Sequence, residues 1–525
     1  MHPVVRAGSI DVMREKSLRR IFAGLPVLET QGDMDRLVRG LAYDSRDVGS
    51  GFLFVAMDGH HSDGHRFIDD AVARGASAVL HRQPVEGPAP GVTYIRVENP
   101  RTSLSPVAAE FFGHPSRSLG VIGVTGTDGK SSTVWFIAQL LSLLNRRAGF
   151  LSTVSFQTAE QIVKNPFRQS TPEASEIHGM LRDMVDIGKE FAVVEATSHG
   201  LSSRNNRLGD VIFDAAVLTN VTHEHLEFHG SFEQYRSDKA NLFRSLSIAE
   251  RKRDPRGTPL SLPRFGVVNA DDPSAAYFRA ASRVPVFSYG LRSKADLCAG
   301  GVQGDMTGTC LILTDSNREA PARLRIPGPF WVENTLAACL AVARLLDLDP
   351  LSLAPLLQEL SGVKGRMESV DLGQPFTVIV DYAHTPAAFE RLFPWVRKTV
   401  QGRITAVFGS AGERDRAKRP MQGEAASRYA DTLVITDEDP RGEDRVEILE
   451  QIAAGCANRK RGDDLFLVPD RPEAIRLAFQ KASPGDVVLL LGKGHEGSII
   501  GPSGPAPWDE RTEAERALRS LGYGT

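Results

Sequence analysis

The chain has 525 residues, of which 41% are hydrophobic and 24% charged, and its formal net charge is -3. This length predicts about three domains, and the absence of a basic surplus argues against a nucleic-acid partner. Four cysteines, Cys298, Cys310, Cys339 and Cys456, lack metal-site spacing, which fits a reducing cytoplasm. Because no apolar run reaches the roughly 18 to 20 residues of a membrane helix and no apolar signal core opens the chain, we expect a cytoplasmic protein that acts on small molecules, with no membrane partner.

The first region, residues 1–117, is predicted to be a small α/β domain. Residues 52–56 (FLFVA) and 76–80 (ASAVL) are short strand-like runs. Residues 67–76 between them have the pattern of a short helix.

The second region, residues 118–363, opens with the apolar run 119–124, a Gly-rich loop and a helical pattern over 131–147. Strand, Gly-rich loop and helix form the context that a phosphate-binding loop requires. Continuous apolar runs at 191–196, 215–220 and 265–270 follow. They predict a mainly parallel sheet covered on both faces.

The loop itself, 121-VIGVTGTDGKSST-133, departs from the usual phosphate loop, because Val124 stands where a glycine is expected and Asp128 adds a negative charge. Backbone N–H groups of such a loop and the following helix N-terminus attract phosphate. Lys130 can reach terminal phosphates, and Ser131 or Ser132 can place a hydroxyl on magnesium. The alternative is a Gly-rich turn without a ligand.

Acidic and basic groups follow the next two strands. Glu195, at the end of one, is a candidate magnesium ligand. The segment 219–243 holds three histidines and Lys239. Zinc is an alternative there, but His223 and His225 at i, i+2 do not share a helix face, and an isolated Lys239 would ordinarily be solvated or ion-paired.

The third region, residues 364–525, contains strand-like runs that end in polar residues. They are 376-FTVIVDYAHT-385, 404-ITAVFGSAGERD-415, 432-TLVITDEDPR-441 and 486-DVVLLLGKGHE-496. Ligands of open α/β sheets bind beyond the carboxyl ends of the strands, so the four ends predict one shared site. The alternative is that these loops are simply polar.

Ten motifs in one order then carry a resemblance: GTDGKSS, EATSH, LTNVTHEHLEFHG, YRSDKANLF, NADDP, GRME, DYAHTP, FGSAGERDRAKRP, DEDPR and GKGHE. The chain resembles the Mur ligases, and within them those that add the third residue of the peptidoglycan stem peptide. The resemblance implies an N-terminal UDP-substrate domain, a central ATPase domain with a mainly parallel sheet, and a C-terminal Rossmann-like domain. It also implies small-molecule substrates, and we expect a monomer.

The resemblance further implies an ATP-dependent ligation with Mg²⁺. A D-Glu carboxylate attacks the γ-phosphate, and an amino acid then displaces phosphate from the acyl phosphate. It implies catalytic roles for Lys130, His225 and Lys239, the last as N6-carboxylysine, and magnesium ligation by Ser131, Glu195, His225 and the modified Lys239. The implied ATP contacts are Gly126, Thr127, Asp128, Gly129, Lys130, Ser131, Ser132, Asn334, Arg366 and Asp381, with His384 a further candidate.

The substrate residues carry over one by one. The implied UDP-substrate contacts are Tyr43, Ser45, His60, His61, Ser62, Ser170, Thr171, Thr197 and Arg207. Arg207 aligns only if two residues are inserted, so Arg204 competes with it. The implied amino-acid contacts are Arg414, Glu438, Asp439, Pro440, Arg441, Gly492 and Glu496.

The identity of the added amino acid depends on residues 438–441. Arg441 suits the distal carboxylate of meso-diaminopimelate, whereas Asp439 replaces the asparagine of diaminopimelate-adding members and adds a negative charge. Diaminopimelate is favoured, with ornithine or lysine as alternatives. A non-ligating nucleotide-binding paralogue is the rival from another class. Folylpolyglutamate and cyanophycin-type ligases are disfavoured by the segments DSR, DEDPR and GKGHE.

Overall fold

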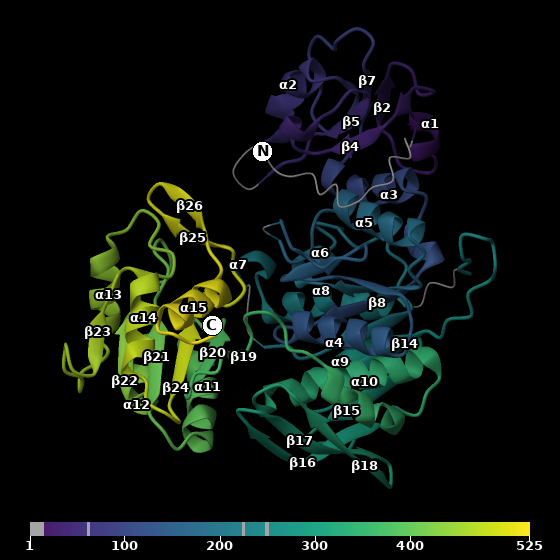
Figure 1. The fold of residues 1–525 in the computed structure, drawn as a ribbon. Coiled ribbons are helices and arrows are strands. Elements are labelled where there is room, and N and C mark those ends of the chain that lie inside the picture. The colour runs from purple at the N-terminus through teal and green to yellow at the C-terminus, as the bar shows by residue number, and fades with distance from the viewer. Residues whose placement is uncertain (1–14, 60–62, 168, 223–225, 247–250, 525) are drawn as a thin grey trace. The chain divides into compact units, whose positions relative to one another are not determined.

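The computed structural model describes residues 15–59, 63–167, 169–222, 226–246 and 251–524 (Figure 1). The chain divides into two compact units. The first runs up to Ala299 and includes Leu313–Ala320 and Val332–Leu353; the second comprises Gly300–Ile312, Pro321–Trp331 and Ala354–Thr525. None of the helices in the described ranges is long and apolar enough to cross a membrane.

The N-terminal sheet of the first unit has the order β2-β7-β6-β5-β4, and β4 to β7 are parallel. Its strands are β2 (Glu29–Gln31), β4 (Gly40–Ala42), β5 (Phe52–Val55), β6 (Ala76–His81) and β7 (Thr93–Arg96). The other elements are β1 (Lys16–Ser17), α1 (Leu18–Ile21), β3 (Leu37–Val38), η1 (Ser45–Asp47), η2 (Gly64–Phe67), α2 (Ile68–Ala73), α3 (Pro100–Phe111) and η3 (Pro115–Ser118). The predicted strands at 52–56 and 76–80 are confirmed as β5 and β6. The predicted helix is confirmed as η2 and α2.

The largest sheet runs in the order β11-β10-β9-β12-β8-β13-β14-β15-β16. Its strands are β8 (Gly120–Thr125), β9 (Ala148–Leu151), β10 (Ser155–Gln157), β11 (Val163–Lys164), β12 (Phe191–Glu195), β13 (Ala215–Leu218), β14 (Phe265–Asn269), β15 (Val286–Gly290) and β16 (Leu297–Asp305). From β9 to β16 along this order the pairs are parallel. Strands β17 (Gly308–Asp315) and β18 (Arg318–Leu324) follow β16 in the chain. The predicted mainly parallel sheet is confirmed.

The central strands of this sheet are buried, and polar residues follow their carboxyl ends. Every residue of β8, β12, β13 and β14 is buried, as expected for strands covered on both faces. The helices are α4 (Lys130–Leu143), α5 (Ala174–Asp186), α6 (Ser198–Leu201), α7 (Leu226–His229), α8 (Phe232–Ser245), α9 (Ala275–Ala281), η4 (Pro329–Trp331), α10 (Val332–Leu346) and η5 (Pro350–Glu359). Glu195 pairs with Val124, and Leu218 pairs with Thr125. The phosphate-type loop, Glu195 and Thr219 therefore leave the sheet side by side.

The sheet of the second unit has the order β19-β20-β24-β21-β22-β23, and every pair except β19–β20 is parallel. Its strands are β19 (Glu368–Val370), β20 (Thr377–Asp381), β21 (Ile404–Phe408), β22 (Thr432–Ile435), β23 (Leu465–Leu467) and β24 (Val487–Leu491), and β25 (Ser498–Gly501) pairs with β26 (Gly504–Pro507). The helices are α11 (Pro386–Thr399), α12 (Lys418–Tyr429), α13 (Arg445–Ala453), α14 (Arg471–Lys481) and α15 (Glu510–Ser520). Apolar residues of α14 and α15 pack on this sheet in one buried cluster.

The four strand-like runs of the third region are confirmed as β20, β21, β22 and β24. Their carboxyl ends lie at one edge because the strands are parallel neighbours. The exact boundaries 1–117, 118–363 and 364–525 stay a prediction. The α/β class with mostly parallel sheets is confirmed.

Candidate active site

The phosphate-type loop connects β8 to α4 through two glycines with positive φ. Gly126 has φ 152° and Gly129, the N-cap of α4, has φ 80°. A Cβ on Gly126 would lie 1.8 Å from Thr219 Oγ1, and one on Gly129 would lie 2.3 Å from Asn334 Oδ1. Both positions therefore require glycine. Val124 belongs to strand β8, which explains why no glycine stands there.

The loop is tied to the segment that follows β13. Thr127 N donates to Asn220 O at 2.8 Å, and Asp128 N donates to Asn220 Oδ1 at 2.9 Å. Thr219 Oγ1 donates to Asp128 O at 2.6 Å. Asp128 itself is exposed, so water can solvate its carboxylate. The loop thus has a fixed shape, as electrostatic preorganisation for phosphate requires.

Both predicted lysines contact this loop. Lys130 Nζ donates to Thr127 O at 2.7 Å, and Lys239 Nζ donates to Gly126 O at 2.6 Å. Lys239 is only 2% exposed, and its Nζ lies 4.4 Å from the centre of the Tyr235 ring. Tyr235 OH in turn shares a 2.9 Å hydrogen bond with Thr127 Oγ1. The structure therefore brings two cations, from α4 and α8, to one short loop.

An oxygen cluster lies at the end of β12. Ser131 Oγ donates to Glu195 Oε2 at 2.8 Å, and Thr153 donates its hydroxyl to Oε1 and its N–H to Oε2, each at 2.8 Å. Hydroxyl and carboxylate oxygens are ligand types that Mg²⁺ prefers. Thr153 was not predicted as a site residue from the sequence, although it follows β9, the neighbour of β12. His225 lies outside the described residues.

The zinc alternative gains no support from the residues that the structure describes. His223 and His225 lie outside them. Within the described ranges, only Asp58, Asp63 and His65 place three ligand-type atoms within 4.8 Å of one another. His65 is already occupied, because its Nε2 accepts from Arg82 N at 3.0 Å and its Nδ1 bonds Asp63 at 2.6 Å. This group has a structural role.

A buried Ser-His-Asp chain stands beside Lys239. His229 Nδ1 donates to Asp238 Oδ2 at 2.7 Å, so its Nε2 accepts from Ser198 Oγ at 3.1 Å. Gln234 Nε2 also donates to Asp238, at 2.9 Å. These bonds connect α6, α7 and α8, and so fix the helix turn that carries Lys239. This pairing was not predicted from the sequence.

A cavity of about 990 Å³ in the first unit adjoins the loop. Eight of the residues predicted from the sequence line it: Tyr43, Ser45, Lys130, Ser170, Thr171, Thr197, Arg207 and Lys239. Residues from the N-terminal sheet and the central sheet thus face one space. His60, His61 and Ser62 lie outside the described residues.

The structure separates the two competing arginines. Arg207 lines the cavity and is 8% exposed, and it donates to Thr171 O at 3.0 Å and to Glu173 Oε1 at 2.7 Å. Arg204 is exposed and donates to Phe228 O at 3.3 Å. Arg207 is therefore the one positioned to meet a ligand in the cavity. Its partner Glu173 was not predicted as a site residue from the sequence.

Tyr43 meets another acid that the sequence did not reveal. Burial raises the pKa of Glu176 to about 7, and burial together with the neighbouring Glu176 raises the pKa of the Tyr43 hydroxyl. Tyr43, which lines the cavity, therefore stays a neutral hydrogen-bonding group.

The remaining predicted ATP contacts lie in both units. Asn334, in the first unit, accepts from Thr133 Oγ1 at 3.4 Å. In the second unit, Asp381 accepts from Met367 N at 2.7 Å and Ala383 N at 2.8 Å, and burial raises its pKa. Arg366 lies over the Tyr382 ring at 4.5 Å.

His384 belongs to the same segment as Asp381. Its Nδ1 donates to Tyr382 O at 2.9 Å, and burial lowers its pKa, which favours the neutral imidazole.

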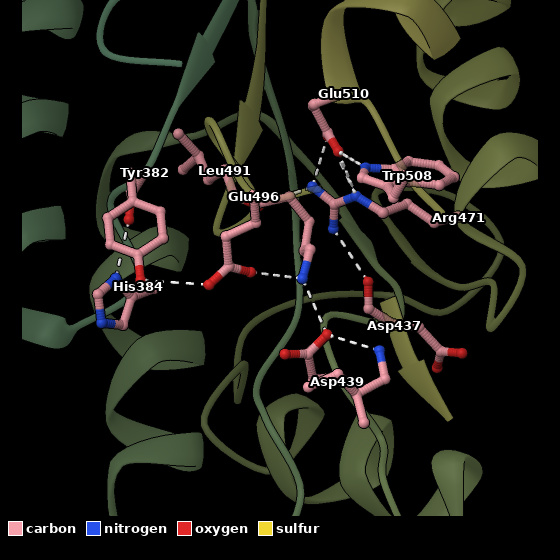
Figure 2. A network of polar contacts seen from close by, with 11 residues as sticks. Tyr382, His384, Asp437, Asp439, Arg471, Leu491, Glu496, Trp508 and Glu510 are labelled. Carbon is pink, nitrogen blue, oxygen red and sulfur yellow. Dashed lines mark hydrogen bonds and ion pairs between the residues drawn. The ribbon is translucent and has the colours of Figure 1, made fainter. Parts of the chain in front are cut away.

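The predicted amino-acid contacts lie at the carboxyl ends of β21, β22 and β24, and Figure 2 shows their polar network. Lys493 Nζ donates to Asp439 Oδ1 at 2.8 Å and also to Glu496 Oε2. Asp439 Oδ1 accepts from Ile500 N as well, at 2.9 Å. Lys493 is fully buried, so it offsets the charge that Asp439 adds. Pro440 is buried beside these residues, and Arg414 is exposed on the loop after β21.

Four buried polar atoms in the loops after β21 and β22 have no hydrogen-bond partner among the described residues: Ser410 Oγ, Asp437 Oδ1, Glu438 Oε2 and Arg441 Nε. Burial raises the pKa of Glu438 to about 7. Arg441 is held at φ 54° with its N–H on Ile500 O at 2.8 Å. Gly492 has φ 99°, and a Cβ there would lie 3.2 Å from Glu438 Oε2. Orphaned acidic, basic and hydroxyl groups at one strand edge indicate a polar ligand.

Comparison with known proteins supplies the family. Residues 37–112 match the Mur ligase family catalytic domain, residues 124–342 the Mur ligase middle domain, and residues 365–494 the Mur ligase glutamate ligase domain. A UDP-N-acetylmuramyl-tripeptide synthetase from Roseiflexus sp. (strain RS-1) is 49% identical, over 93% of this chain and 96% of that protein.

The names of two further similar proteins include the amino acid that those proteins add. A UDP-N-acetylmuramoyl-L-alanyl-D-glutamate–2,6-diaminopimelate ligase from Geobacillus kaustophilus (strain HTA426) is 37% identical, over 92% of this chain and 95% of that protein. A solved structure of a ligase of the same name is 27% identical, with a TM-score of 0.66 over 97% of this chain and all of that one. The loop, the cavity and these matches over nearly the full length agree, and the chain belongs to the Mur ligase family of ATP-dependent ligases.

Proposed function

We propose that the protein joins a diamino acid to UDP-N-acetylmuramoyl-L-alanyl-D-glutamate with consumption of ATP, as a monomer in cytoplasmic peptidoglycan precursor synthesis. One observation carries this proposal. Lys130 and Lys239 of the phosphate-type loop line the same cavity as Tyr43, Thr171 and Arg207. Predicted ATP contacts and predicted UDP-substrate contacts thus face one space.

The chemistry follows from this arrangement. A D-Glu carboxylate oxygen attacks the γ-phosphorus, the bond to the β,γ-bridging oxygen breaks, and ADP leaves with that electron pair. The amino group of the incoming amino acid then attacks the acyl carbon, and the tetrahedral intermediate expels inorganic phosphate while the nitrogen loses a proton. Lys130, whose Nζ donates to Thr127 O at 2.7 Å, is the group proposed to bind a phosphate oxygen and stabilise the growing negative charge.

Mg²⁺ fits the oxygen cluster at the end of β12. We propose Ser131 and Glu195 as ligands of one ion, with the Thr153 hydroxyl holding the carboxylate in place. His225 and Lys239 are proposed for the other. When bound, Mg²⁺ offsets the negative charge of the phosphate oxygens.

Lys239 needs modification for this role. An ammonium repels a divalent cation, whereas an N6-carboxylated lysine is an anion. Its buried Nζ donates to Gly126 O and so lies against the loop that is proposed to bind the phosphates. The hydrogen-bonded chain Ser198-His229-Asp238 fixes the turn of α8 that carries Lys239 and so orients its side chain.

The second unit supports meso-diaminopimelate as the amino acid. Because Lys493 offsets Asp439, the acidic replacement does not by itself select a purely cationic side chain. Arg441 then remains for the distal carboxylate, and Glu438 for an ammonium. Arg414, Gly492 and Glu496 complete the proposed contacts, while Asn334, Arg366 and Asp381 are proposed for ATP. Ornithine and lysine remain the alternatives.

The test measures ADP and phosphate release with the UDP-linked dipeptide and each of meso-diaminopimelate, L-ornithine and L-lysine. We expect release to require both the dipeptide and an amino acid, with the highest kcat/KM for diaminopimelate. A preference for ornithine or lysine would overturn the proposed specificity. Absence of release with every amino acid would support the non-ligating paralogue instead.

A further inference from the structure

Arg471 is a fully buried cation beneath the proposed amino-acid site. It is the first residue of α14, whose N-cap Asp470 accepts from Glu473 N, and it is 1% exposed. Glu510, the first residue of α15, is likewise 1% exposed and receives two N–H groups of Arg471, at 2.9 Å from Nε and 2.6 Å from Nη2. Figure 2 shows this fork-to-fork pair, with Trp508 Nε1 donating to Glu510 at 2.7 Å.

The rest of the guanidinium binds two backbone carbonyls. Nη1 donates to Asp437 O at 3.0 Å, and Nη2 donates to Leu491 O at 2.8 Å. Asp437 directly precedes Glu438, and Leu491, the last residue of β24, directly precedes Gly492. One side chain thus holds the chain immediately before two predicted ligand contacts.

This link crosses a strand. In the sheet, β21 lies between β22 and β24, so no ladder hydrogen bond joins those two strands. Their loops nevertheless meet, because a Cβ on Gly492 would be 3.2 Å from Glu438 Oε2. The planar guanidinium, with donors in a fixed fork, sets the spacing of the two carbonyls in a way that a flexible ammonium cannot.

Stability alone does not account for the pair. Removing two charges from water is costly, and buried ion pairs are often no more stabilising than apolar residues of similar volume. The Arg471–Glu510 pair also binds two backbone carbonyls beside the proposed amino-acid site. It thereby holds these two loops at a fixed spacing, which apolar side chains cannot do.

We infer that Arg471, oriented by Glu510 and Trp508, is a positioning residue for amino-acid recognition. It fixes the 437–441 loop against the 492–496 loop, and so sets where Glu438, Arg441 and Glu496 meet the incoming amino acid. This inference rests on the proposed function, since it places the amino acid at these loops.

The test uses the full-length enzyme and two changes of Arg471. Arg471→Lys keeps the charge, but its ammonium has fewer N–H donors than the guanidinium uses and lacks the fixed fork that binds Glu510 and both carbonyls. The pair Arg471→Met with Glu510→Leu replaces the ion pair with apolar groups of similar size. Because this change also removes the partners of the Asp437 and Leu491 carbonyls and of Trp508 Nε1, the unfolding midpoint of each variant is measured and only folded enzyme is compared. In both, the KM for the amino acid should rise roughly tenfold to hundredfold, while the KM values for ATP and the UDP-linked dipeptide change less than about twofold.

The opposite edge of the same sheet offers a matched control. Arg397 donates to Asp431 Oδ2 at 2.8 Å and to Gly402 O at 2.5 Å, near the amino ends of β21 and β22. Arg397→Lys should leave the KM for the amino acid unchanged. An unchanged amino-acid KM in folded Arg471 variants, or an equal rise in all three KM values, would overturn the inference.

A second measurement is independent of ligation. Amide hydrogen exchange in the unliganded protein should become faster at 437–441 and 492–496 in the Arg471 variants, and remain as in the wild type in Arg397→Lys. Unchanged exchange in both loops would overturn the inference. A wild-type enzyme that ligates no amino acid would instead count against the proposed function.

Discussion

Glu438→Gln is expected to stabilise the protein while weakening amino-acid binding. Glu438 is 7% exposed, its Oε2 has no partner among the described residues, and burial raises its pKa from 4.5 to about 7. A shift of this size corresponds to about 3 kcal/mol. Gln has nearly the same shape and no charge, so it avoids this cost.

The sign of the pH dependence follows from the raised pKa. Below about pH 4.5 the carboxyl is protonated in both the folded and the unfolded chain. Between pH 4.5 and 7 the unfolded chain releases the proton first, so the stability contributed by this group is lost as pH rises. The gain in unfolding free energy from Glu438→Gln should therefore grow from near zero at pH 4.5 to about 3 kcal/mol at pH 8.

Urea unfolding of the wild type and Glu438→Gln at pH 5 and pH 8 measures this gain. Glu424→Gln is the control, because the Glu424 side chain is 63% exposed and its replacement should change stability by less than about 0.5 kcal/mol at either pH. In ligation assays at pH 8, Glu438→Gln should raise the KM for the amino acid, since an ionised carboxylate meets its ammonium. The reasoning is refuted if the gain is the same at both pH values, or if the variant is less stable than the wild type at pH 8.

Three further outcomes are expected. Lys239→Arg keeps the positive charge but cannot be carboxylated, so ligation should fall on the order of 100-fold. The bicarbonate-dependent mass increase expected for the wild-type peptide that contains Lys239 should be absent from the variant, and near-normal turnover of the variant would contradict the modified-lysine role. Arg207→Ala should raise the KM for the UDP-linked dipeptide about tenfold, whereas Arg204→Ala should change it less than twofold; equal effects would contradict the placement of Arg207 in the cavity. Asp439→Asn removes one of the two carboxylates that pair with Lys493, so the unfolding free energy should fall by about 1–3 kcal/mol in urea titrations, and increased stability would contradict that pairing.

Local patterns in the sequence predicted most of the framework. Strands β5, β8, β12 and β24 are continuous apolar runs, and burial on both faces makes such runs easy to recognise. The Gly-rich loop was also recognised from the sequence. The structure shows why its glycines are needed, because their backbone conformations and close neighbours exclude side chains. The strands at 297–324 were not predicted.

Pairings between distant segments could not be predicted in this way. Thr153 reaches Glu195 from 42 residues away, and Glu510 reaches Arg471 across 39 residues. A single sequence contains both partners but no signal that they meet, because sheet order and helix packing decide which strand ends become neighbours. Arg207 is buried and lines the cavity while Arg204 is exposed, a difference that depends on the same packing.

The ion pairs of Lys493 with Asp439 and Glu496 also limit how the proposed amino-acid site can change during evolution. One buried lysine serves two carboxylates, Asp439 and Glu496, that lie 57 residues apart in the chain. Replacing either acid alone leaves the lysine with less compensation, so its effect depends on which residue occupies the other position. A shift of amino-acid preference is therefore more accessible through paired substitutions than through single ones, and homologues with different acceptors should differ at these positions together.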